Sequence, residues 1–234
     1  MKIRSSLVVV PLKEVVSGRN KLAEYIQEIA TEQFAVLAMI NSVEYYDLHA
    51  TQYISDTMTV DMQEIYQRFL SRLPLNSSIL DAGCGSGRDA LAFEKLGYRI
   101  TAFDACELLA AHAGEILGRN VAVKRFDQVD EVAIYHGIWA CASLLHVSST
   151  ELPAVFQKLW RALKPGGVLY CSFKWGQGER LQDGRLFTDA DDVRIVQWTS
   201  GLKGCGDRQS WITEDLRPGR NEQWLNALLF KADA

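Results

Sequence analysis

The fold is decided by the stretch Ile79-Leu80-Asp81-Ala82-Gly83-Cys84-Gly85-Ser86-Gly87-Arg88-Asp89, which has the pattern of a strand, a glycine turn and a helix. The three glycines stand at alternate positions, where the lack of side chains lets the backbone turn sharply and approach a ligand closely. The helix that follows would point its free N–H groups toward that ligand. A dinucleotide-binding turn has the spacing G-x-G-x-x-G, whereas this one has G-x-G-x-G. The pattern therefore indicates a nucleotide-binding turn of a different type.

The same stretch resembles the first motif of the class I S-adenosylmethionine-dependent methyltransferases, which is an acidic residue followed by G-x-G-x-G. Here Asp81 precedes the glycines. In that family the turn faces the methionine part of S-adenosylmethionine, and an acidic residue that ends the next strand takes the ribose hydroxyls. Asp104 closes the expected strand over residues 98–103. The resemblance therefore implies that Asp104 binds the ribose and that S-adenosylmethionine is the cofactor.

Length and composition allow one α/β domain with a small appendage. The chain has 234 residues, of which 48% are hydrophobic, enough for a sizeable core. Its formal net charge is −4 and its basic residues are not clustered, which disfavours a nucleic-acid partner. The five cysteines show no C-x-x-C spacing, which argues against a disulfide framework and against a zinc site. We therefore expect a cytoplasmic protein without a metal.

No apolar run approaches the roughly 20 residues that cross a bilayer, so we expect no membrane partner. The apolar run over residues 7–10 ends at Pro11 and is too short for a signal peptide, whose apolar part has about 7–15 residues. The sequence leaves the oligomeric state open between a monomer and a homodimer.

The chain divides near residue 44. We interpret residues 1–44 as a helical N-terminal extension that packs on the domain, with a dimer surface or a cap over the active site as the alternatives. The apolar positions that predict its helix are spaced i, i+3, i+4, i+7: Leu22, Tyr25, Ile26 and Ile29. By the resemblance, residues 45–234 form the methyltransferase domain.

From Ser77 onward, expected strands and helices alternate, which indicates a parallel sheet with helices on both faces. Later strands are expected over residues 121–126, 137–142 and 168–173, and two closing strands, over 209–213 and 223–230, should pair as an antiparallel hairpin. The resemblance implies a Rossmann-like, doubly wound sheet of seven strands, mostly parallel with an antiparallel last strand, plus N-terminal helices. The turn Lys164-Pro165-Gly166-Gly167 is a further match to that family.

The expected cofactor contacts come from several segments. Tyr46 and Tyr53 would share one face of a helix, where they either cover the core or, as the resemblance suggests, close over the cofactor. Asp127, or else Gln128, would accept a hydrogen bond from the adenine amino group, unless this acid only caps a turn. The full set of expected contacts is Tyr46, Tyr53, Asp81, Gly83, Cys84, Gly85, Gly87, Arg88, Asp104, Ala105, Asp127, Gln128 and Ala142.

His146 follows the fourth expected strand, at the edge where parallel sheets bind ligands. It is the candidate general base for a hydroxyl or protonated amine acceptor, with a packing role as the alternative. A thiol or soft anion could instead arrive ionised, and would then be held by His146, Lys174 and Arg180. The expected substrate contacts are Ser143, Lys174, Trp175 and Arg180. No Asp/Asn-Pro-Pro-aromatic motif follows this strand, which disfavours the exocyclic amino group of a base as acceptor and favours a small molecule.

Residues 174–180 read as a flexible polar loop at the same edge. Together with residues 183–185 they resemble the small bacterial methyltransferases of the tellurite-resistance type. Two other functions stay open beside methyl transfer to a small molecule. One is a nicotinamide-dependent oxidoreductase, which the glycine spacing disfavours. The other is a non-catalytic S-adenosylmethionine-binding scaffold that works through its N-terminal helices.

Overall fold

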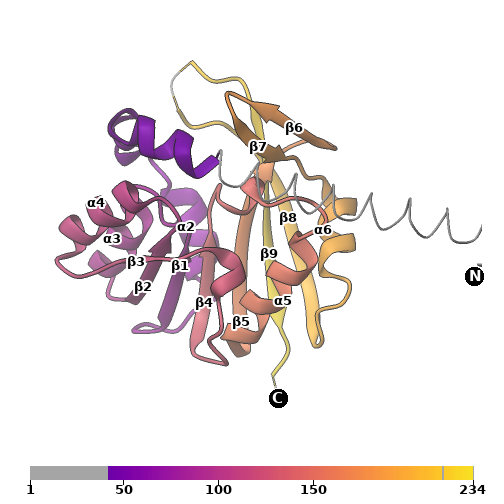
Figure 1. Ribbon diagram of the computed structural model, residues 1–234. Helices are drawn as coiled ribbons and strands as arrows, with labels where there is room; N and C mark the ends of the chain where they lie inside the picture. The colour runs from indigo at the N-terminus through magenta and orange to yellow at the C-terminus, as the bar shows by residue number, and fades with distance from the viewer. Residues whose placement is uncertain (1–41, 218, 234) are drawn as a thin grey trace, which may run out of the picture. The chain divides into compact units, whose positions relative to one another are not determined.

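A computed structural model describes residues 42–217 and 219–233 (Figure 1). The predicted extension over residues 1–44 lies almost wholly outside this part, so the domain boundary stays a prediction. Residues 42–58 are helical. The elements that follow are α2 (Gln63–Leu70), β1 (Ser78–Ala82), α3 (Arg88–Lys95), β2 (Arg99–Asp104), α4 (Glu107–Leu117), β3 (Ala122–Val123), η1 (Phe126–Gln128), β4 (Tyr135–Ala140), η2 (Leu144–His146), α5 (Leu152–Ala162), β5 (Leu163–Lys174), β6 (Glu179–Gln182), β7 (Arg185–Thr188), α6 (Asp192–Thr199), β8 (Cys205–Glu214) and β9 (Gln223–Lys231).

Seven strands form one sheet in the order β3-β2-β1-β4-β5-β9-β8 (Figure 1). The pairs among β1 to β5 are parallel, and β9 is antiparallel to both β5 and β8. The predicted doubly wound sheet and its closing hairpin are thus confirmed, with the antiparallel strand inserted between β5 and β8. The chain leaves β1 toward β2 on one side and returns to β4 on the other, which makes the edge at the end of β1 the place where such sheets bind ligands.

Successive residues of the buried strands serve two separate cores. On β4, Ile138 packs in the core that α5 covers, while Trp139 packs with Phe69 and Phe93 of α2 and α3 on the opposite face. This alternation is the period of two that a strand imposes. The Trp139 ring also stacks on that of Tyr170 in β5, with centroids 3.9 Å apart. Both faces of the central strands β4 and β5 are therefore close-packed, which holds the ends of these strands in place.

Two segments differ from the expectation. β3 spans only Ala122–Val123 and pairs with the last residues of β2, since Phe126–Gln128 turns as a short 3₁₀ helix. The expected flexible loop after β5 instead leads into a β6–β7 hairpin. Its turn residues Asp183 and Gly184 both have left-handed backbone angles, with φ of 52° and 77°. Asp-Gly favours this type I′ turn, and it makes the segment an ordered hairpin.

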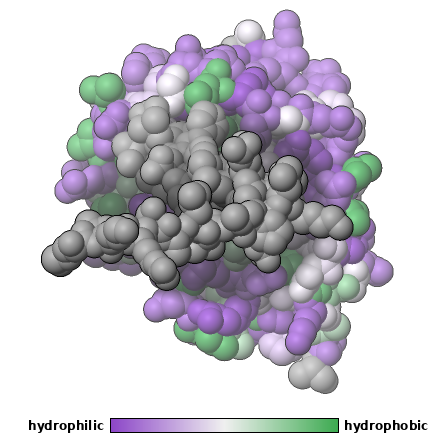
Figure 2. Space-filling view, turned by 45° about the vertical axis from the view of Figure 1, so that its right-hand side comes forward, coloured by the Kyte–Doolittle hydropathy of each residue, from purple (hydrophilic) through white to green (hydrophobic). Residues whose placement is uncertain are grey.

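The hairpin and the helix over residues 42–58 lie at the same edge of the sheet, at the top of Figure 1. The backbone N–H of Leu186 in β7 donates to Ser42 Oγ at 3.1 Å. Around the grey residues in Figure 2, hydrophilic residues predominate and hydrophobic ones form small separate groups. Within the described residues, no helix combines the length and apolar character that crossing a membrane requires.

Candidate functional site

Two adjoining cavities open at the carboxyl edge of the sheet. The first, here called the Asp104 cavity, has a volume of about 340 Å³. The second, the Arg185 cavity, has about 260 Å³ and extends toward β5, the β6–β7 hairpin and the segment between β8 and β9. The residues that line both are Tyr46, Tyr53, Gly83, Ala142 and His146. The two cavities therefore meet at the ends of β1 and β4 and form one continuous site.

The glycine turn needs glycine for two reasons. Gly83, Gly85 and Gly87 all have left-handed φ values, of 78°, 53° and 76°, which side chains disfavour. In addition, a Cβ on Gly83 would lie 2.6 Å from Ser143 Cβ, and one on Gly85 would lie 2.8 Å from the Tyr53 hydroxyl. The turn is thus packed directly against two side chains of the site.

Asp104 ends β2 inside the Asp104 cavity. Its Oδ2 accepts from Gly85 N at 2.7 Å, and its Oδ1 accepts from Cys106 N at 2.9 Å. Burial raises the pKa of this carboxyl group, while the backbone N–H groups oppose that shift because they stabilise its charged form. Each oxygen keeps a lone pair for a further donor. The carboxylate can therefore accept from two neighbouring hydroxyl groups.

The remaining walls of the Asp104 cavity suit a flat base. Leu109, Phe126 and Val155 supply apolar surface, and Asp127 lies at the lining with its carboxylate paired to Arg125 at 2.7 Å. That pairing helps to hold the pKa of Asp127 below its usual value. Gln128 is not among the lining residues, because its side chain accepts from Arg125 N at 2.8 Å. Of the two expected adenine contacts, only Asp127 reaches the cavity.

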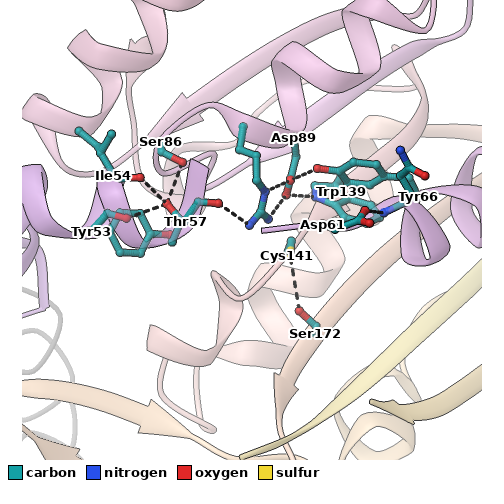
Figure 3. A network of polar contacts seen from close by, with 12 residues as sticks. Tyr53, Ile54, Thr57, Asp61, Tyr66, Ser86, Asp89, Trp139, Cys141 and Ser172 are labelled. Carbon is teal, nitrogen blue, oxygen red and sulfur yellow. Dashed lines mark hydrogen bonds and ion pairs between the residues drawn. The ribbon is translucent and has the colours of Figure 1, made fainter. Parts of the chain in front are cut away.

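A polar network joins the glycine turn to the helix over residues 42–58 (Figure 3). Arg88 pairs with Asp89 through Nε at 2.6 Å and Nη2 at 3.0 Å, and its Nη1 donates to the carbonyl of Thr57 at 3.3 Å. The Thr57 hydroxyl donates to Ser86 Oγ at 3.0 Å. Asp89 also accepts from Trp139 Nε1 at 2.8 Å and from the Tyr66 hydroxyl. The network fixes Arg88 at the floor of the Arg185 cavity.

The pKa values of two neighbouring carboxyl groups, Asp89 and Asp81, shift in opposite directions. Burial alone would raise the pKa of Asp89, but Arg88 and the Tyr66 and Trp139 donors hold it below its usual value. Burial raises the pKa of Asp81 well above its usual range, and Asp89 adds to the shift. Asp81 Oδ2 has no hydrogen-bond partner among the described residues. Asp81 lines neither cavity, so it lies beneath the site.

His146 is held at the junction of the cavities by two hydrogen bonds. Its Nδ1 lies 2.7 Å from the carbonyl oxygen of Leu186, which can only accept, so we infer that Nδ1 carries the proton. Its Nε2 then accepts from the Tyr46 hydroxyl at 2.8 Å. Burial lowers the pKa of His146 to about 4, and the cations Arg185 and Lys174 add to the shift. The ring is therefore neutral at neutral pH and serves as an acceptor for Tyr46.

The structure brings together only part of the predicted set. Ser143 lines the Asp104 cavity, and Lys174 lines the Arg185 cavity, where it pairs with Glu222. Trp175 and Arg180 line neither, since Trp175 is 40% exposed and Arg180 is held by Asp189. The predicted cofactor contacts that line a cavity are Tyr46, Tyr53, Gly83, Cys84, Gly85, Arg88, Asp104, Ala105, Asp127 and Ala142, whereas Asp81, Gly87 and Gln128 do not.

Sequence reasoning missed the hairpin residues of the Arg185 cavity. Arg185 and Phe187 both come from β7, and the Asp183-Gly184 pair just before them is the local signal that could have found this strand. The lining residues between β8 and β9, among them Arg217 and Glu222, carry no comparable pattern.

In the described part of the chain, no cluster of His, Cys, Asp and Glu side chains could hold a metal ion.

Comparisons with known proteins point in one direction. A family model described as a methyltransferase domain matches residues 54–202. A malonyl-[acyl-carrier protein] O-methyltransferase of Xylella fastidiosa (strain M23) is 28% identical over 169 residues, which cover 65% of this chain and 55% of that protein. The S-adenosyl-L-methionine-dependent Diels-Alderase iliD of Neonectria sp. (strain DH2) is 33% identical over 95 residues, which cover 41% of this chain and 37% of that protein. The chain thus matches about half, or less, of the length of these relatives.

Among solved structures, the chain is similar to the 1,6-didemethyltoxoflavin-N1-methyltransferase of Burkholderia thailandensis, crystallised with 1,6-didemethyltoxoflavin and S-adenosylhomocysteine. The TM-score is 0.67 at 21% identity, and the match covers 86% of this chain and 90% of that chain. At this identity the likeness shows the fold.

Proposed function

The chain belongs to the methyltransferase domain family, and we propose from this that it transfers the methyl group of S-adenosylmethionine to a small-molecule acceptor. One observation carries the proposal: the carboxylate of Asp104, held by Gly85 N and Cys106 N, lies in a cavity that opens at His146 into a second cavity. A nucleoside and an acceptor can therefore bind side by side. The likeness to the tellurite-resistance type also stays a proposal, supported by residues 174–180 and 183–185.

We assign the parts of the cofactor to residues as follows. Asp104 accepts from the ribose hydroxyls, Asp127 accepts from the adenine amino group, and Leu109 and Phe126 cover the base. The backbone of the glycine turn and Arg88 face the amino-acid end. When bound, S-adenosylmethionine supplies an activated methyl group, so orientation of the acceptor can provide much of the acceleration.

The residues at the junction orient the acceptor and keep water away. Tyr53 packs against the glycine turn at Gly85, and the Tyr46 ring lies beside it, with ring centroids 5.1 Å apart. For an acceptor that must lose a proton, the Tyr46 hydroxyl would take that proton while it donates its own to His146 Nε2. His146 would then act through Tyr46 as the base.

A second candidate function is S-adenosylmethionine binding without methyl transfer. It is favoured by the lowered pKa of His146, about 4, which makes this group a weak base, and by the relative named as a Diels-Alderase.

The experiment that separates the two candidate functions uses S-adenosylmethionine with a radiolabelled methyl group and a panel of small carboxylic acids, phenols, amines and thiols. Isothermal titration with S-adenosylhomocysteine should show binding in the micromolar range. Label in any acceptor supports transfer, whereas binding without label across the panel supports the second candidate. Absence of binding would contradict both.

A further inference from the structure

We propose that the Arg185 cavity takes its acceptor as a planar organic oxyanion, a conjugated carboxylate or phenolate, and that Arg185 is the residue that selects it. The inference rests on the proposed function and names the acceptor class of the same site. It starts from the environment of one guanidinium group, which the predicted set of site residues did not include.

The Arg185 side chain is half-buried and incompletely bonded. It is 17% exposed, and its guanidinium carbon lies 3.8 Å from the ring centroid of Tyr45 and 5.0 Å from that of Phe187. Its Nε is buried and has no hydrogen-bond partner among the described residues. A buried N–H group without an acceptor costs about 1–3 kcal/mol. Because protein atoms cover Nε, a ligand oxygen would meet the exposed part of the Arg185 side chain instead, which lines the Arg185 cavity.

Arg185 is also the least neutralised of the buried and half-buried cations that line its cavity. The other three are each paired with a carboxylate: Arg88 with Asp89, Lys174 with Glu222 and Arg217 with Asp215. The carboxylate nearest to Arg185 is that of Asp183, 3.5 Å from Nη2, and its side chain is 63% exposed. An ion pair this exposed contributes little. Arg220, which also lines the cavity, is exposed and lies in the segment between β8 and β9.

The stacking geometry favours a flat acceptor. A guanidinium group that lies against Tyr45 directs its N–H groups outward in its own plane, where they match the oxygens of a planar anion. The Tyr46 and Phe187 rings flank the same group at 5.8 and 5.0 Å. An acceptor ring could pack on this aromatic wall while its oxygen meets Arg185.

The charge around the junction favours the ionised acceptor. Arg185 and Lys174 both lower the pKa of His146, and Arg185 also opposes the burial that raises the pKa of Tyr46, where the opposite influence of Asp104 is smaller. This positive field stabilises an acid in its charged form. A lone pair of the acceptor oxygen then forms the O–CH₃ bond while the S–CH₃ bond breaks, and the bonding pair stays on sulfur. The products are a methyl ester or ether and S-adenosylhomocysteine, and no proton has to leave.

The test uses a shape-matched pair of probes, 2-naphthoate and its neutral counterpart 2-naphthamide. Each is titrated calorimetrically into the 234-residue chain, with and without saturating S-adenosylhomocysteine. A charge-assisted hydrogen bond to Arg185 predicts about tenfold or more tighter binding of the carboxylate. Arg185→Gln should abolish this preference, and Arg185→Lys should keep part of it. The matched control is Arg194→Gln, because Arg194 also stacks on an aromatic ring, that of Trp198 at 4.9 Å, but lines neither cavity.

The outcomes separate this inference from the proposed function. Unchanged affinity of Arg185→Gln for S-adenosylhomocysteine, with the charge preference lost, supports the inference. Equal affinity for the two probes, no measurable binding of the carboxylate, or a preference that survives in Arg185→Gln overturns it. A protein that does not bind S-adenosylhomocysteine overturns the proposed function, while the titrations without it still decide the charge preference. Radiolabelled methyl transfer to 2-naphthoate or to 2-naphthol then distinguishes a carboxylate from a phenolate acceptor.

Discussion

Asp104 is the residue on which cofactor binding should depend most. Its two oxygens accept from Gly85 N and Cys106 N, each has a further lone pair, and the residue lines the Asp104 cavity. We predict that Asp104→Ala weakens binding of S-adenosylhomocysteine by about 10-fold to 100-fold, as expected for loss of hydrogen bonds to a charged acceptor. Isothermal titration measures the change.

The control for this substitution is Asp130→Ala. The Asp130 side chain is 85% exposed and lies 3.6 Å from Lys124, outside both cavities. The Asp130→Ala protein should bind S-adenosylhomocysteine with the same affinity as the unaltered protein. Because Asp104 also fixes the backbone of the glycine turn, circular dichroism must show that Asp104→Ala is folded. Full affinity in a folded Asp104→Ala protein would contradict the ribose assignment.

His146 should make the protein sensitive to acid. Its pKa is lowered from 6.5 to about 4 in the folded protein, so between these values the unfolded chain binds a proton that the folded chain does not. The contribution of His146 to the free energy of unfolding is therefore fully present above about pH 6.5. It is lost as the pH drops toward 4 and below, and the loss is roughly 3 kcal/mol at most. We predict that His146→Asn is less stable at pH 7.5 but loses less stability between pH 7.5 and 4.5.

Urea unfolding at a series of pH values measures this difference. His49→Asn is the control, because it makes the same substitution at an exposed histidine that lines neither cavity. An acid slope of His146→Asn as steep as that of the unaltered protein would show that the His146 ring is not buried in its neutral form.

At the scale of elements, the β6–β7 hairpin places Arg185, and its turn depends on Gly184. Gly184 has a φ of 77°, and a Cβ there would meet nothing within 4 Å, so backbone strain alone opposes a side chain. We predict that Gly184→Val costs about 1–3 kcal/mol locally. It should speed hydrogen exchange in β6 and β7 and weaken binding of 2-naphthoate, with S-adenosylhomocysteine binding retained.

Gly184→Asn is the matched control, since asparagine adopts left-handed angles more readily than other side chains. It should keep most of the exchange protection in the hairpin. If valine and asparagine gave the same exchange rates, the type I′ turn would not be what orders this segment.

The elements differ in how well the sequence predicts them. The apolar run of β4 and the stripe of α5 follow from local periodicity, because each needs only its own buried face. β3 is shorter than its β-forming residues suggest, because among the described strands it pairs only with the end of β2. Residues 174–180 are predicted as a loop and no strand is predicted over residues 181–188, so the sequence analysis misses the hairpin although its Asp-Gly turn is a local signal.

At the scale of the molecule, the sheet could be predicted because strand and helix segments alternate along the chain. Asp104 and the glycines could be predicted because a short motif fixes them within one βαβ unit. Contacts between distant segments could not. Tyr46 meets His146 across 100 positions, and Ser42 meets Leu186 across 144. No local pattern encodes such a pair, so the Arg185 cavity becomes visible only in three dimensions.

These distant contacts lead to a prediction about the whole domain. The site is lined by the helix over residues 42–58, the turn after β1 and the segment after β4, and Thr57–Ser86 and Tyr46–His146 join these parts. A ligand that touches all of them should stabilise them together. At 100 times its dissociation constant, S-adenosylhomocysteine should raise the free energy of unfolding by about 2.7 kcal/mol. Hydrogen exchange should slow in residues 42–58 as well as in the glycine turn, and at the same concentration Asp104→Ala should keep only about 0.4–1.4 kcal/mol of the stabilisation. Slowing confined to the turn and the end of β2 would show that the helix does not take part in binding.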